Sequence, residues 1–166
     1  MVERKYMAHY IDASFGGTET NYVRLGKDLE EYTENLNPQV EAKRNILGEN
    51  SVHVYGFQPQ SEVTPFYYDY DDALSEKIVD IINGRKTGDN LRTTMVDALL
   101  KPGTTDADPP TVVWAFREDC VVVPSSGPGG NTTGVQTPFT IYKAGNRVKG
   151  TFNLTTKAFT EQTDQG

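Results

Sequence analysis

Side chains that could perform acid–base, nucleophilic or metal chemistry are few in this sequence. It contains two histidines, His9 and His53, and a single cysteine, Cys120. His9 lies in a predicted N-terminal arm, His53 alternates with valines as in a strand, and Cys120 precedes three valines, a setting typical of a buried small hydrophobe. We therefore predict no catalytic or ligand role for either histidine, no disulfide and no cysteine metal cluster.

Two motifs resemble ligand sites, but local structure explains each of them better. Asp69, Asp71 and Asp72 lack the spacing, central glycine and terminal glutamate of a calcium loop, and acidic residues before a helix cap its free N–H groups. The glycine-rich loop 125–130 is followed by no Gly-Lys-Ser/Thr, which disfavours a phosphate cradle, and Gly-x-Ser-x-Gly is absent. We predict no enzyme activity, no catalytic residue, no metal and no cofactor.

Four aromatic residues cluster at Phe66, Tyr67, Tyr68 and Tyr70. They could form a face that stacks on sugars or bases, although such clusters more commonly pack a sheet against a helix. The stacking interpretation keeps open a carbohydrate-binding module as an alternative function. A hydrolase with a dispersed acidic pair is a second alternative, without a motif to support it.

The charge balance argues against a protein that binds nucleic acid through phosphate contacts. Sixteen basic and twenty-three acidic residues give a formal net charge of −7 over 166 residues. Phosphate-binding proteins need a basic patch, whereas Lys and Arg are dispersed here, in nothing larger than adjacent pairs such as Arg4-Lys5. Apolar runs such as 98–100 and 121–123 are far below the ~20 residues of a membrane-spanning helix. We expect no membrane span and no export signal.

One helix and several strands must position these residues. The sequence predicts a helix over 69–86, because Leu74, Ile78 and Ile81 recur at helical spacing and Gly84 provides a stop signal. Strands are predicted over 22–25, 39–44, 51–57, 63–68, 91–100, 111–123, 138–144 and 148–155. We expect a mainly β fold, an antiparallel β-sandwich or barrel-like core with one flanking α-helix.

Two irregularities are expected in the last strands. Gly145-Asn146 predicts a two-residue hairpin turn, and the charged residues 117–119 predict a bulge or bend. The predicted core side chains are Leu74, Ile78, Ile81, Trp114, Phe116, Val148, Phe152 and Leu154.

Segment 30–50 does not fit the compact part of the single predicted domain, 1–166. It is polar and weakly alternating, and it is interrupted at Asn37-Pro38 and Gly48, so it cannot bury enough surface to become ordered alone. We predict an extended hairpin or loop that needs a partner, flanked by an N-terminal arm (1–17) and a C-terminal tail (160–166).

Six segments together resemble the major tail tube proteins of long-tailed bacteriophages, in their order and spacing around the predicted helix. The resemblance covers about 22–159, and the segments are 34–39 (ENLNPQ), 43–49 (KRNILGE), 55–60 (YGFQPQ), 117–124 (REDCVVVP), 134–141 (GVQTPFTI) and 145–152 (GNRVKGTF). None of these segments carries catalytic chemistry. Residues 1–17 and 127–131 depart most from the family pattern.

The resemblance implies a structural virion protein whose copies form hexameric rings that stack into a hollow tube, through which double-stranded DNA passes without specific binding. Sheets of neighbouring subunits would join at their edges, which would cover exposed edge strands. Six copies at −7 each would carry −42 per ring, and such a wall would repel DNA phosphates. The inter-ring contact candidates are Asn35, Asn37, Pro38, Asn45, Ile46, Leu47 and Gly48.

The family further implies a tape-measure protein, a tail-tip initiator and a tail terminator as partners, with assembly in the bacterial host cytoplasm and final location in the virion tail. The same tube fold serves contractile phages and headless bacteriocins, and the sequence does not separate these. The alternative function is a β-sandwich module that binds a carbohydrate or a receptor, as part of a tail or of a cell-surface assembly.

Overall fold

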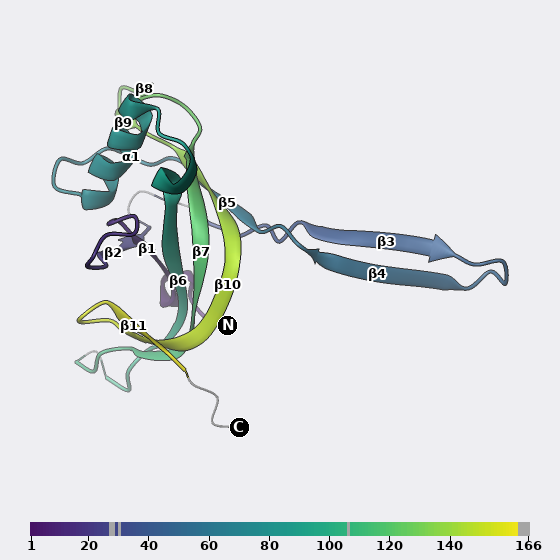
Figure 1. Ribbon diagram of the computed structural model, residues 1–166. Coiled ribbons are helices and arrows are strands. Elements are labelled where there is room, and N and C mark those ends of the chain that lie inside the picture. Colours follow the sequence, from purple (N-terminus) through teal and green to yellow (C-terminus); the bar gives the residue numbers. More distant parts are fainter. Residues whose placement is uncertain (27–28, 30, 106, 163–166) are drawn as a thin grey trace.

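The main feature of the computed structural model is a curled antiparallel sheet that forms a half-barrel (Figure 1). The structure describes residues 1–26, 29, 31–105 and 107–162. Six strands follow the order β11-β10-β7-β6-β1-β2, and β5 pairs with β10 on the same edge as β11. These strands are β1 (Met7–Asp12), β2 (Tyr22–Leu25), β5 (Gln60–Val63), β6 (Arg92–Lys101), β7 (Thr111–Pro124), β10 (Phe139–Asn153) and β11 (Ala158–Glu161). The prediction of a mainly β fold with a barrel-like core and one α-helix is confirmed.

Two short hairpins and three helical elements complete the described fold. The hairpins are β3 (Pro38–Arg44) with β4 (Asn50–Phe57), and β8 (Gly129–Asn131) with β9 (Gly134–Gln136). The helical elements are η1 (Arg4–Tyr6), α1 (Ala73–Gly84) and η2 (Gly88–Leu91).

Helix α1 begins after its N-cap residue, Asp72, and ends before its C-cap residue, Arg85. The Asp72 carboxylate accepts a hydrogen bond from the Leu74 N–H at 3.0 Å, and Arg85 adopts a left-handed conformation with φ of 48° after the last turn. The helix is therefore shorter than the predicted range 69–86, since residues 69–72 form its approach and cap. Its apolar stripe, which contains Leu74 and Ile78, is buried as expected.

The strand register divides the buried residues between the two faces of the sheet, because successive side chains alternate. Ile11 is opposite Met95 on the face that α1 covers, and Tyr10 is opposite Val96 on the other. The first core also contains Leu74, Ile78, Cys120, Val122, Phe139 and Ile141, and the second contains Ala98, Ala115 and Phe152.

The predicted core side chains are buried to different degrees. Leu74, Ile78, Ile81 and Phe152 are buried, whereas Trp114, Phe116, Val148 and Leu154 are only partly buried.

The prediction of an N-terminal arm over 1–17 is wrong for residues 7–12. Residues 7–12 form β1, which pairs with β2 on one side and β6 on the other. Ala8 and Ile11 are fully buried, because the two faces of this strand contact different cores. His9 and Asp12 within β1 obscure this pattern in the sequence.

The hairpin predicted at Gly145-Asn146 is also wrong, because the chain continues through these residues as one strand, β10. The segments before and after them both pair with β7, with register shifts between Lys143 and Val148. Gly145 and Asn146 have positive φ values of 96° and 56°, so the irregularity is a bulge in β10. The bend predicted at 117–119 does not interrupt β7, whose pairing with β6 is continuous there.

Three other predicted boundaries shift. The strand predicted over 63–68 is β5 at 60–63, and the predicted tail 160–166 begins inside β11, with residues 163–166 outside the described part. The extended segment predicted over 30–50 corresponds to a hairpin over 38–57. Tyr32 belongs to the core cluster on the helix-covered face, and residue 30 lies outside the described residues.

Candidate functional site

The β3–β4 hairpin projects from the half-barrel as a separate arm (Figure 1). Its two strands pair antiparallel from Pro38 opposite Phe57 to Arg44 opposite Asn50. An isolated two-stranded hairpin is at best marginally stable in water, so such an arm needs additional support. Part of that support is internal, since the Tyr55 hydroxyl donates a hydrogen bond to the Glu41 carboxylate across the strands.

One face of this arm is apolar and exposed. Val40 is opposite Val54 and Ala42 is opposite Val52, so these four side chains form a cross-strand patch. Val40, Val52 and Val54 are 53%, 64% and 56% exposed. This apolar face is a candidate contact surface for another protein chain.

The tip of the arm is ordered by its own hydrogen bonds. The Asn45 side-chain oxygen accepts from the backbone N–H groups of Leu47 and Glu49, both at 2.9 Å, and Gly48 donates to the Asn45 carbonyl at 3.0 Å. Gly48 has a φ of +80°, which a glycine adopts without strain. The loop thereby presents Ile46 and Leu47 to solvent, 102% and 77% exposed. A preorganised apolar tip loses little conformational entropy on binding.

The predicted contact residues divide between the two ends of the arm. Asn45, Ile46, Leu47 and Gly48 form the tip, whereas Asn35, Asn37 and Pro38 lie at the root. At the root, Asn35 exchanges two backbone hydrogen bonds with Gln60, and the Asn37 amide donates to the Gln58 carbonyl at 3.0 Å. The root residues thus anchor the arm to the sheet, and the tip residues are free to contact a partner.

The apolar face of the arm was not predicted from the sequence. Val40 with Ala42, and Val52 with Val54, follow the period of two that defines a strand face. The apolar alternation is present in each strand separately. The pairing of β3 with β4, which brings the four side chains into one patch, could not be predicted from the sequence.

A polar cluster of His9, Asp97 and Lys143 lies on the same face of the sheet as α1. His9 Nδ1 and Asp97 Oδ1 are 2.6 Å apart, and Lys143 Nζ lies 3.0 Å from Asp97 Oδ2. The Lys143 side chain is fully buried, and Asp97 is 5% exposed. Burial opposes the charge of Asp97, but the hydrogen bond from His9 and the nearby Lys143 ammonium hold its pKa below the usual value.

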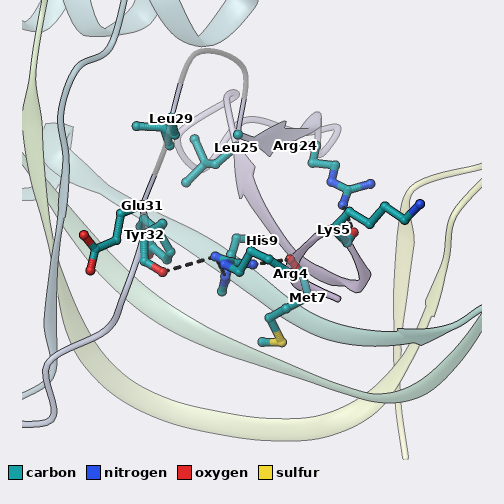
Figure 2. Close-up of a pocket in the computed structure, with 10 residues that line it drawn as sticks. Arg4, Lys5, Met7, His9, Arg24, Leu25, Leu29, Glu31 and Tyr32 are labelled. Carbon is teal, nitrogen blue, oxygen red and sulfur yellow. Dashed lines mark hydrogen bonds between the residues drawn. The ribbon is translucent and has the colours of Figure 1, made fainter. Parts of the chain in front are cut away.

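A pocket of about 570 Å³ opens beside this cluster (Figure 2). His9, Tyr32 and Arg4 form one wall, with the Tyr32 ring 4.4 Å from the His9 ring. Arg24 and Glu31 also line it. Because residues 1–17 were predicted to be an arm, sequence reasoning did not place His9 at this site.

The aromatic cluster 66–70 and Cys120 are the remaining candidate features. Phe66 is buried against Phe139 with an edge-to-face geometry, while Tyr70 is 83% exposed and its ring stands at 82° to that of Tyr68. These rings therefore do not form one flat platform for a sugar. Burial raises the pKa of the Cys120 thiol to about 12, which keeps it protonated and unreactive.

Comparison with known proteins adds no relative: no protein-family model matches the chain, and no curated protein matches it significantly. Within the described part of the chain, every helix is too short or too polar to cross a membrane.

Proposed function

We propose that this chain is a tail tube subunit of a long-tailed bacteriophage or a related injection device. Its copies form hexameric rings that stack into a hollow tube for genome delivery. The observation that carries this proposal is the β3–β4 arm, which combines an exposed apolar face with the ordered tip at Ile46 and Leu47. The arm fits a contact with the next ring.

The edges of the half-barrel supply a second kind of contact. Strand β2 ends the sheet on one side, and β5 with β11 end it on the other. Exposed sheet edges favour pairing with another chain, and a curled sheet with two such edges can be continued around a ring. Because the two edges differ, each contact is head-to-tail and can close into a ring of six.

The net charge of −7 suits a conduit for DNA, since like charge weakens adhesion of phosphates to a wall. In this role the chain catalyses no reaction. Its partners are its own copies, with a tape-measure protein, a tail-tip initiator and a tail terminator. The subunit is assembled in the host cytoplasm and located in the virion tail.

The test is removal of the arm. Pro38 and Phe57 are paired, so residues 39–56 can be replaced by an Asn-Gly turn without displacing the root. We expect the shortened chain to keep its circular dichroism spectrum and to sediment as a monomer or single ring, while the intact chain forms longer assemblies. Stacked tubes from the shortened chain would contradict the proposed role of the arm.

A further inference from the structure

The Arg4 guanidinium holds the N-terminal segment against the sheet through three hydrogen bonds. Arg4 Nη1 donates to the Met7 carbonyl at 2.7 Å, and Nη2 lies 3.1 Å from both His9 Nε2 and the Tyr32 carbonyl. Figure 2 shows Arg4 and His9 side by side on the wall of the pocket, next to Tyr32. Two further contacts attach this segment: Arg24 Nη2 donates a hydrogen bond to the Lys5 carbonyl at 2.6 Å, and the Tyr6 ring is partly buried against the second core.

This geometry fixes the protonation state of His9. A guanidinium only donates hydrogen bonds, so His9 Nε2 must carry a lone pair toward Arg4. His9 Nδ1 therefore carries the proton and donates it to Asp97 Oδ1, 2.6 Å away. These two contacts together assign the Nδ1–H tautomer to His9.

The charges around His9 leave little compensation for a further positive charge. Asp97 is the carboxylate in contact, and its other oxygen already accepts a hydrogen bond from the buried Lys143 ammonium. Further away, Glu34 is half-buried, and burial raises its pKa, while Glu118 is paired with Arg147. The Tyr32 ring lies 4.4 Å from the His9 ring and is tilted by 53° to it, and Glu31 lines the pocket. A protonated His9 would share the Asp97 carboxylate with Lys143 and would face the Arg4 guanidinium on its other side.

We propose that protonation of His9 expels the Arg4 guanidinium and loosens the N-terminal segment, residues 1–6, from the sheet. The new Nε2–H would face the Nη2 donor of Arg4, so one hydrogen bond is lost and a repulsion between two cations replaces it. Histidine is the side chain that ordinarily changes charge between pH 5 and 8. The device makes attachment of the segment sensitive to mild acid, and it does not depend on the proposed function.

The first test reads the tautomer directly. Nitrogen-15 NMR of the histidine rings is simple here because the chain has two histidines. At neutral pH we expect His9 to show a protonated Nδ1 and an unprotonated Nε2, and both nitrogens to be protonated in acid. A neutral His9 with the proton on Nε2 would overturn the proposal, and this measurement requires no variant.

The second test follows the segment itself by amide hydrogen exchange. The Tyr6 and Met7 amides donate to the carbonyls of Glu3 and Arg4, so they report opening of the N-terminal turn. After correction for the intrinsic rate, we expect their exchange to rise by about tenfold to a hundredfold between about pH 7.5 and pH 5.5, as expected from losing a hydrogen bond to a charged group. The amides of β6 and β7 should stay protected.

Three variants test whether the pH dependence of amide exchange comes from the contact between His9 and Arg4. His9→Gln can still accept from Arg4 but cannot gain a charge, so its exchange should lose the pH dependence. His53→Gln, the matched control in the exposed arm, should keep it. Arg4→Gln should leave the segment loose at both pH values. An unchanged pH response in His9→Gln, or equal protection of the wild-type segment at both pH values, would overturn the proposal.

Discussion

At the scale of single residues, the chain separates side chains that stabilise the fold from side chains that are free to contact a partner. Asp97, with His9 and Lys143, belongs to the first group, because the Lys143 side chain is buried with it and His9 is partly buried. Ile46 and Leu47 belong to the second group, because their side chains are exposed to solvent at the tip of the arm and do not pack against the sheet. Substitutions in the two groups should therefore give opposite results in stability and assembly.

Removing the Asp97 charge should destabilise the fold. Asp97→Asn leaves the buried Lys143 ammonium without its counter-ion, which costs about 3–5 kcal/mol when one partner of a buried pair is removed. Urea unfolding at neutral pH measures the loss. Asp80→Asn, which breaks an exposed pair with Lys86, is the control and should have little effect. Equal stability of the two variants would contradict the assignment.

The same carboxylate predicts how stability changes in acid. Because its pKa is lower in the folded than in the unfolded chain, Asp97 contributes stability above the unfolded value of about 3.9, and this contribution is lost as the pH falls through the folded value. We expect the free energy of unfolding to fall below about pH 4. The fall should be smaller in Asp97→Asn; an identical acid profile would show that other carboxylates cause it.

The tip substitution should affect assembly alone. Ile46→Asp with Leu47→Asp alters two exposed side chains, so the free energy of unfolding should stay within about 0.5 kcal/mol of wild type. We expect tube formation, followed by light scattering, to be abolished because charges replace the apolar contact. Tyr70→Asp is a matched control on an exposed aromatic beside α1, and it should assemble normally. Normal assembly of the tip variant would exclude Ile46 and Leu47 from the contact.

At the scale of the elements, Gly150 decides how closely β11 approaches β10. A Cβ at this position would clash with the Thr160 carbonyl oxygen and the Phe159 ring. Gly150→Val should therefore detach β11 and cost about 1–3 kcal/mol, while the rest of the sheet stays folded. Amide exchange of residues 158–161 measures the detachment. Gly127→Ala, where nothing lies within 4 Å, is the control. Intact protection of β11 would contradict this account.

The elements also show what the sequence could and could not predict. Helix α1 and the strand pattern were predictable because each follows from local spacing and capping. The strand β1 was missed because both of its faces are covered, so its burial follows from distant segments. Gly145-Asn146 has the composition of a turn, yet pairing with β7 on both sides converts it into a bulge. The His9–Asp97–Lys143 cluster joins three strands, and no local motif encodes it.

At the scale of the whole molecule, the half-barrel has open sheet edges and the arm has exposed apolar side chains. The curled sheet ends at β2 on one side and at β5 and β11 on the other, and the arm extends beyond the sheet (Figure 1). A closed ring would cover the edges, and stacking would cover the arm. The proposal of a tail tube subunit rests on this combination of surfaces.

Electron microscopy of the purified, concentrated chain in negative stain is the most direct test of that proposal. We expect hollow rods or six-fold rings from the intact chain, and no rods from the variant that lacks residues 39–56. Isolated particles of 18.4 kDa at every concentration reached, with no rings and no rods, would contradict it.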